Sequence, residues 1–146
     1  MSQPHVTRGG TATVARSRAH ESVSDSRRLL VRGLAIVGLA GIALVHLIEM
    51  PDTWRQTPGL GALFTILVVA SAAVATALLL DDTSLAWLAA ALVAAGPIAG
   101  YLLTRSVSVP FDHEDVGNWL EPLVLVALFV EVSVLGLCGY AWRVRR

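Results

Sequence analysis

The sequence contains no lysine and a single cysteine, and charged residues occupy only 15% of its 146 positions. One cysteine, Cys138, excludes an intrachain disulfide and any cysteine-rich zinc or iron–sulfur site. Acidic and basic residues balance at eleven each, so no overall positive field indicates nucleic-acid binding. The chain also lacks a phosphate-binding glycine loop, a Gly-x-Ser-x-Gly turn and a His-Glu-x-x-His zinc motif. These absences argue against nucleic-acid binding and against an enzyme.

Apolar residues are abundant instead, at 55% of the chain, and they gather in four long runs. A helix needs about 20 consecutive apolar residues to cross the hydrocarbon core of a membrane. The runs are too long for strands and show no alternation of apolar and polar residues. We therefore predict an all-α fold with one domain, residues 29–146, that forms a four-transmembrane-helix bundle. Its predicted spans are about 29–48, 60–80, 85–103 and 120–142.

Residues 1–28 have a different composition, rich in serine, threonine, arginine and glycine and without apolar periodicity. Such a segment cannot bury enough apolar surface to fold alone, so we predict a disordered N-terminal tail. A cleaved signal peptide is disfavoured, because the charged region is too long and no small-residue cleavage site follows the first apolar run.

The arginines predict the orientation of the spans. Six precede or begin the first span and three follow the last, whereas the two links on the other side contain only Arg55 and Arg105. Positive charge stays on the cytoplasmic side, so we expect a multi-pass protein of the plasma membrane with both termini in the cytoplasm. The four tryptophans fall near predicted span ends, as interfacial tryptophans do: Trp54, Trp87, Trp119 and Trp142.

Small residues predict how the helices pack. Lipid is as apolar as leucine, so membrane helices associate where small residues let their backbones approach closely. The third run contains a Gly-x-x-x-Gly pair, and the first two runs contain further small-residue pairs. These pairs predict contacts within the chain or with a partner helix: Gly96/Gly100, Gly38/Gly41, Ser71/Ala75, Ala72/Thr76 and Ala73/Ala77.

Polar residues gather where the spans end on the outer side. His46 and Glu49 are three positions apart, so both project from one side of a helix, just before Pro51, which we expect to end it. In an antiparallel bundle these ends meet, which predicts an outer-rim cluster of His46, Glu49, Tyr101, Arg105 and Glu121. Arg105 with Glu49 or Glu121 would form a charge-assisted pair. The cluster is interpreted first as a structural clasp that holds the helix ends together.

Three other interpretations of the rim remain open. Imidazole and carboxylates suit zinc, manganese or iron, which makes His46, Glu49, Glu121 and His113 candidate ligands of a divalent metal, although Arg105 would repel a cation. A pocket for a small anion or polar ligand and a proton path are the other two. No other cofactor is predicted, since only His46 lies within reach of a span and a bis-histidine haem is disfavoured.

Glu131 lies near the middle of the fourth span, ten positions after Glu121 and so about 15 Å deeper. An ionised carboxylate near the bilayer centre costs several kcal/mol, so we expect a neutral carboxyl at this depth. It could donate a hydrogen bond to Thr65, Ser71, Thr76 or a backbone carbonyl. Alternatively, Glu121 and Glu131 could form a two-step proton relay.

The order of these motifs resembles that in a group of small four-helix membrane proteins of high-GC Gram-positive (actinobacterial) bacteria, which have no settled function. The resemblance covers most of the chain after residue 30 and implies that the rim residues belong together. It supplies no activity. The matching pieces are His46-x-x-Glu49-x-Pro51, Gly61-x-x-Phe64, Gly100-Tyr101 followed by Arg105 and Pro110, Trp119-x-Glu121-Pro122, and Glu131.

The sequence thus predicts a small non-catalytic protein embedded in the lipid bilayer. We expect an accessory subunit or partner-binding protein, whose rim and small-residue faces contact a membrane-protein partner or a second copy of the chain. The alternative is the binding or transport of a proton, a divalent metal or a small polar ligand through the rim and Glu131.

Overall fold

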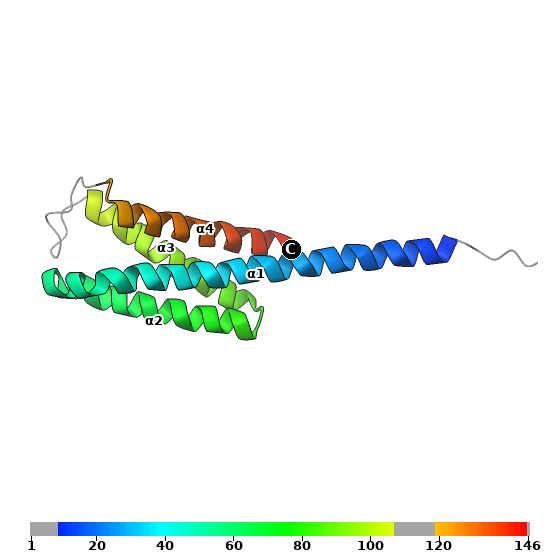
Figure 1. Cartoon of the computed structure of the whole chain (residues 1–146), viewed down its shortest axis with the longest axis horizontal. Helices are drawn as coiled ribbons and strands as arrows, with labels where there is room; N and C mark the ends of the chain where they lie inside the picture. Colours follow the sequence, from blue (N-terminus) through cyan, green and yellow to red (C-terminus); the bar gives the residue numbers. More distant parts are fainter. Residues whose placement is uncertain (1–8, 107–118, 146) are drawn as a thin grey trace, which may run out of the picture.

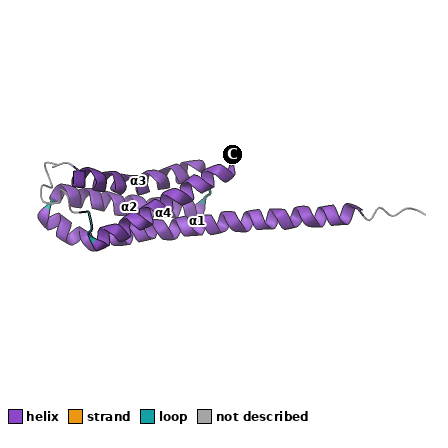
Figure 2. Cartoon of the chain, turned by 90° about the horizontal axis from the view of Figure 1, so that it is seen from above, coloured by secondary structure: helices purple, strands orange, loops and turns teal. Residues whose placement is uncertain are grey.

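The computed structural model of the chain describes residues 9–106 and 119–145, with side chains from residue 24 onward. These residues form four helices, α1 (Gly9–Gln56), α2 (Pro58–Leu80), α3 (Ser84–Ser106) and α4 (Pro122–Arg145) (Figure 1). Apart from short connections, the described part of the chain is helical throughout (Figure 2). Each helix is long and apolar enough to cross a membrane. The predicted all-α, four-span fold is confirmed.

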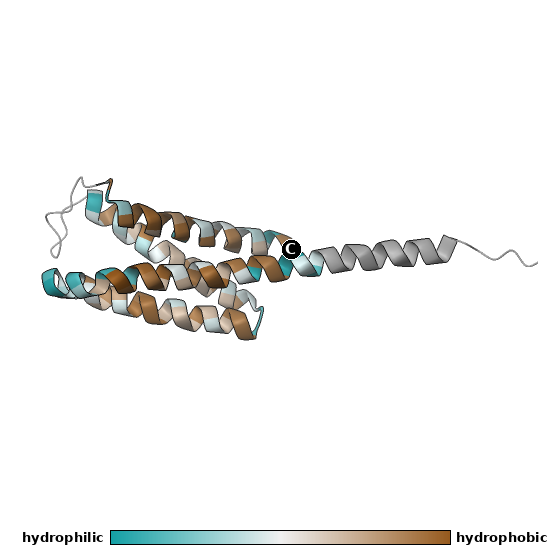
Figure 3. Ribbon diagram, viewed as in Figure 1, coloured by the Kyte–Doolittle hydropathy of each residue, from teal (hydrophilic) through white to brown (hydrophobic). Residues whose placement is uncertain are grey.

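The helices form an up-and-down bundle in which neighbours in sequence are neighbours in space (Figure 1). α1 packs against α2 and α4, and α3 packs against α4 and α2, whereas α2 and α4 lie diagonally without backbone contact between their described residues. We call the end that holds Asp82 and Arg145 the inner end and the end that holds Gln56 and Pro122 the outer end. Hydrophobic residues cover the length of the bundle, and hydrophilic residues collect at these ends (Figure 3).

α1 is longer at its amino end than the sequence predicts. Its backbone is helical from Gly9, twenty residues before the predicted start of the first span, and it projects beyond the other helices at the inner end (Figure 1). The helical residues from Gly9 onward belong to the segment, residues 1–28, whose composition predicts a disordered tail. The physical reason is cooperativity, because a helix already nucleated in the span gains one hydrogen bond for each residue added.

Pro51 does not end α1, and this prediction was wrong. The helix continues for five more residues to Gln56. Proline has no N–H to donate to the carbonyl of the residue four positions earlier, yet membrane helices tolerate it where nearby groups restore the hydrogen bonding. The carbonyl that loses its N–H donor is that of Leu47, and the helix continues past it: the Thr53 hydroxyl donates to the Glu49 carbonyl at 2.9 Å, and the Thr57 N–H donates to its ordinary helical partner, the Thr53 carbonyl, at 2.8 Å. The connection between the first two spans is therefore the single residue Thr57 and is shorter than the sequence predicts.

Gly61 allows this very short turn between α1 and α2. A Cβ atom at Gly61 would lie 2.7 Å from two ring atoms of Trp54 and 3.0 Å from its Cα, closer than a side chain permits. The Trp54 indole N–H donates to the Thr65 hydroxyl at 3.2 Å, and that hydroxyl donates to the Gly61 carbonyl at 2.9 Å. The ring therefore packs closely against a glycine and holds the two helices together at the outer end.

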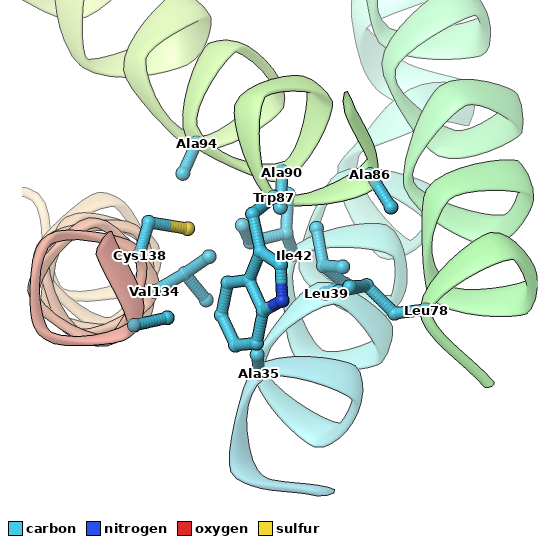
Figure 4. Packing of buried hydrophobic residues seen from close by; sticks show 11 residues of the cluster. Ala35, Leu39, Ile42, Leu78, Ala86, Trp87, Ala90, Ala94, Val134 and Cys138 are labelled. Carbon is cyan, nitrogen blue, oxygen red and sulfur yellow. The ribbon is translucent and has the colours of Figure 1, made fainter. Parts of the chain in front are cut away.

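Trp87 fills the core in the inner half of the bundle. Its side chain is only 2% exposed and lies among Ala35 of α1 and Val134 and Cys138 of α4 (Figure 4). The prediction that all four tryptophans are interfacial was therefore wrong for Trp87. The other three are exposed and lie near helix ends: Trp54, Trp119 and Trp142.

Arginines close the inner end of the bundle. Arg32 donates to the carbonyl oxygens of Leu78 and Leu79, the latter at 2.7 Å, which satisfies carbonyls that the end of α2 leaves without helical partners. Arg145 forms an ion pair with Asp82 and lies over the Trp87 ring, 5.7 Å from its centroid. The Trp87 indole N–H also donates to the Asp82 carboxylate at 2.6 Å. We call Asp82, Trp87 and Arg145 the inner clasp.

The small-residue pairs divide between the inside and the outside of the bundle. Gly38 faces Val134 and Gly41 faces Val130, so the glycine pair of α1 seats α4. Ser71 is fully buried. Nothing lies within 4 Å of a Cβ built on Gly96 or Gly100, and both glycines are exposed. The Gly-x-x-x-Gly pair of α3 therefore contacts no other described helix.

We expect Gly38→Ala to destabilise the bundle by about 1–3 kcal/mol, because its methyl group would overlap the Val134 side chain. Val134 is buried and, being β-branched, has little rotamer freedom with which to move away. The free energy of unfolding in mixed detergent micelles is the measurement. Gly33→Ala is the matched control, since its methyl group meets open space and alanine favours the helix. Equal stability of the two variants would contradict the close packing of α1 on α4.

Candidate functional site

Residues predicted for the outer rim take part in two groups of side chains. One is a buried pair, His46 of α1 and Glu131 of α4, whose Nε2 and Oε1 atoms are 3.8 Å apart. The other lies at the outer end and contains Tyr101, Arg105, Trp119 and Glu121, which we call the outer group. The sequence predicted Glu131 as a separate, deeper feature, and its pairing with a rim residue was not expected.

The buried pair is enclosed by the bundle. His46 is 5% exposed and Glu131 is 1% exposed. The His46 ring is held from two sides, since Nδ1 is 2.9 Å from the Ile42 carbonyl oxygen and the ring meets Phe64 of α2 edge to face at 4.8 Å between centroids. A carbonyl only accepts hydrogen bonds, so Nδ1 carries the proton and Nε2 is directed toward Glu131.

Helix geometry explains why these two side chains meet. The contacts of Gly38 with Val134 and of Gly41 with Val130 set the register of the antiparallel helices α1 and α4. In that register the Cα atoms of His46 and Glu131 are offset by about 8 Å along the bundle axis. Side chains on a helix lean toward its amino end, so His46 leans inward while Glu131 leans outward. Because the two side chains lean toward each other, their Nε2 and Oε1 atoms meet despite the offset of the Cα atoms.

The threonine hydroxyl groups expected to bond Glu131 bond to their own helices instead. Thr65 donates to the Gly61 carbonyl, and Thr76 donates to the Ala72 carbonyl at 2.8 Å. Within residues 24–106 and 119–145, the buried atoms Ser71 Oγ and Glu131 Oε1 have no hydrogen-bond partner. His46 is the basic group that the described chain places beside the Glu131 carboxyl.

The outer group joins the end of α3 to the start of α4. Arg105 is buried, and its Nη2 is 3.4 Å from Oε2 of the partly exposed Glu121. The guanidinium lies 5.4 Å from the centroid of the Tyr101 ring, and the Tyr101 hydroxyl donates to the Trp119 carbonyl at 2.8 Å. The rings of Tyr101 and Trp119 also meet edge to face at 5.8 Å. This geometry is that of a clasp in which Arg105 pairs with Glu121.

The three predicted metal ligands that the structure describes, His46, Glu49 and Glu121, do not form a coordinating set. Among the side chains that the structure describes, no group of three or more histidine, cysteine, aspartate or glutamate residues lies close enough to hold a metal ion. Glu121 belongs to the outer group and His46 to the buried pair, while Glu49 is partly buried one turn from His46 on α1. His113 lies outside the described residues.

Sequence reasoning missed the role of Phe64 beside His46. Phe64 is part of the short motif Gly61-x-x-Phe64, but that motif does not predict which residue Phe64 contacts. The single-residue connection at Thr57 makes α1 and α2 adjacent and so brings Phe64 to His46, but this short connection is a finding of the structure and not a signal in the sequence.

The four-helix fold and the apolar side chains exposed on the outside of the bundle define a multi-pass membrane protein with four candidate spans. Comparisons of the chain with protein-family models, with curated proteins and with solved structures give no match.

Proposed function

We propose that this protein is a non-catalytic membrane subunit that binds a membrane-spanning helix of a partner protein or of a second copy. The binding surface is the outward side of α3, which we call the α3 face and which consists of Leu92, Gly96, Ala99, Gly100 and Leu103. All five residues are exposed in the isolated chain. The observation that carries the proposal is the empty space beside Gly96 and Gly100, where a Cβ atom would meet nothing within 4 Å.

The interior of the bundle supports this use of glycine. Gly38 and Gly41 of α1 pack against Val134 and Val130 of α4. The chain therefore already uses glycines to bring two of its helices into close contact. On the α3 face the same kind of notch is open, with a leucine beyond each end of the glycine pair. Because lipid chains are as apolar as leucine, the gain from filling the notch comes from close van der Waals packing with another helix.

The orientation belongs to the same proposal. The carboxyl end of α4 and the amino-terminal part of α1 lie at the same end of the bundle (Figure 1). We place that inner end in the cytoplasm at the plasma membrane, because the arginines are concentrated there and the links at the outer end carry only Arg55 and Arg105. The outer group then lies at the external surface.

We expect Gly96→Leu and Gly100→Leu each to reduce helix association by at least about tenfold, since a leucine fills the notch and keeps the partner backbone away. Both variants should keep the stability of the wild-type chain, because the new side chains enter open space. Energy transfer between labelled chains in lipid vesicles tests a second copy. Co-purification from native membranes after photo-crosslinking at Leu92 tests a different partner.

Gly136→Leu is the matched control. Gly136 is also an exposed glycine within a span, and a Cβ atom added to it would meet nothing within 4 Å, but it lies on α4. The substitution should leave association unchanged. If the α3 variants associate as the wild type does in both assays, the α3 face is not a binding surface. Loss of association in Gly136→Leu alone would move the binding surface to α4.

The alternative function, binding or transport of a small ligand through the rim and Glu131, is supported by one observation. That observation is the buried pair of His46 and Glu131. Tyr101, Arg105 and Glu121 belong to the outer group instead.

A further inference from the structure

The buried pair brings two hydrogen-bond acceptors face to face. Because the His46 Nδ1–H donates to the Ile42 carbonyl, a neutral His46 directs the lone pair of Nε2 toward Oε1 of Glu131, 3.8 Å away. An ionised Glu131 is likewise acceptor-only. No other described residue donates a hydrogen bond to Oε1, which is buried. Without a proton between them, both atoms would remain unsatisfied in a buried site, which is costly.

We propose that His46 and Glu131 together form a binding site for one exchangeable proton inside the bundle. With that proton bound, either the Glu131 carboxyl donates to Nε2 or a protonated His46 donates to the carboxylate. Both arrangements satisfy both atoms with one hydrogen bond, and the separation would contract from 3.8 Å to about 2.6–2.9 Å. The proton comes from water and returns to water, and no other bond is made or broken.

Few ionisable groups lie on the helices packed around the pair. α2 has no ionisable residue and presents Phe64 to the His46 ring. α3 carries two ionisable side chains, and both have partners, Tyr101 with the Trp119 carbonyl and Arg105 with Glu121. The remaining ionisable groups on the spans near the pair are Glu49 on α1 and Cys138 on α4, with Glu121 at the start of α4.

Proton binding would couple α1 to α4. The two helices already touch next to the pair, where Gly41 faces Val130. When the proton is bound, the pair forms a hydrogen bond between α1 and α4 beside this contact. Without the proton, the Nε2 lone pair of His46 faces a carboxylate oxygen of Glu131, and the two repel. The occupancy of the site therefore changes how firmly α1 and α4 are held together. This inference stands independently of the α3 face.

The test uses the full chain with ¹⁵N-labelled histidine in lipid nanodiscs. The ring ¹⁵N shifts report the protonation of His46, and isotope-edited infrared spectra report the carboxyl C=O band of Glu131. We expect both reporters to change together, with a common midpoint and one proton per chain. In Glu131→Gln the side chain cannot release a proton, so the His46 midpoint should move by about 1 pH unit or more, or His46 should cease to titrate.

Glu121→Gln is the matched control, since it makes the same change beside the start of the same helix in a residue that pairs with Arg105. It should leave the His46 midpoint in place, as should Gly100→Leu, so failure of the helix-binding proposal is recognised separately. If Glu131→Gln does not fold, Glu131→Asp, which keeps a shorter carboxyl, should shift both midpoints. Three results would overturn the proposal: an unchanged His46 midpoint in the Glu131 variant that folds, a Glu131 band unaffected by His46→Gln, or no response of either reporter across the pH range of the folded protein.

Discussion

Trp87→Ala should lower the free energy of unfolding by about 3–5 kcal/mol, the largest effect we expect from any single substitution in this protein. The ring is almost fully enclosed within the bundle, so its removal leaves a cavity that small neighbours such as Ala35, Ala90 and Ala94 cannot fill. The substitution also removes the indole N–H donated to Asp82 and the ring surface beneath Arg145. Reversible unfolding in mixed micelles, followed by far-UV circular dichroism, is the measurement.

Two variants separate the contributions to this loss. Trp142→Ala removes the same side chain near the inner end from an exposed position and should cost less than about 1 kcal/mol. Trp87→Phe keeps most of the ring volume but not the N–H, so it should recover more than half of the loss. A Trp87→Ala protein as stable as the Trp142→Ala protein would show that Trp87 does not fill the core.

The second large effect is an all-or-none difference in chemical labelling. Gln56→Cys places a thiol on the exposed last residue of α1 at the outer end, and Ser84→Cys places one on the exposed first residue of α3 at the inner end. If the termini are cytoplasmic, an impermeant maleimide should label the first variant on intact cells and the second only after the membrane is permeabilised.

The wild-type chain is the control for this experiment, because its one thiol, Cys138, is buried and should not react in the folded protein. Permeabilised cells give the total thiol available in each variant. Labelling of Ser84→Cys on intact cells together with protection of Gln56→Cys would reverse the orientation. It would also place the outer group in the cytoplasm.

The sequence predicts the spans well because each depends on local composition. The inner bounds of α2 and α3 agree with prediction to within about one residue, at Leu80 and Ser84. The error at Pro51 has a physical origin, since a proline removes only one backbone donor and a membrane helix tolerates that loss, which no hydropathy pattern reveals. Because α1 continues to Gln56, His46 lies ten residues, or about 15 Å, from the end of its helix rather than at the rim.

The pairing of side chains across helices is less accessible to sequence reasoning. Depth can be counted along one helix, but the direction of a side chain depends on the rotation of the helix against its neighbours. Trp87 illustrates this, since its position near a span end suggests an interfacial role, whereas Ala90 and Ala94 on the same face are buried with it. Small residues three and seven positions later are a signal that the face points into the bundle. His46 and Glu131, on the first and last spans, offer no such local signal.

The inner clasp has a consequence for the order in which the protein is assembled during synthesis. Asp82 lies in the connection between α2 and α3, and its partner Arg145 is the last residue of α4. While the ribosome is still adding α4, the α1–α2 hairpin is complete and Arg32 can already cap α2. The inner end of α3, in contrast, lacks its Arg145 partner until the whole fourth span has left the ribosome. Closure of the bundle therefore waits for the end of α4, and nascent chains halted within α4 should expose Asp82 and Trp87 to membrane chaperones that finished chains no longer engage.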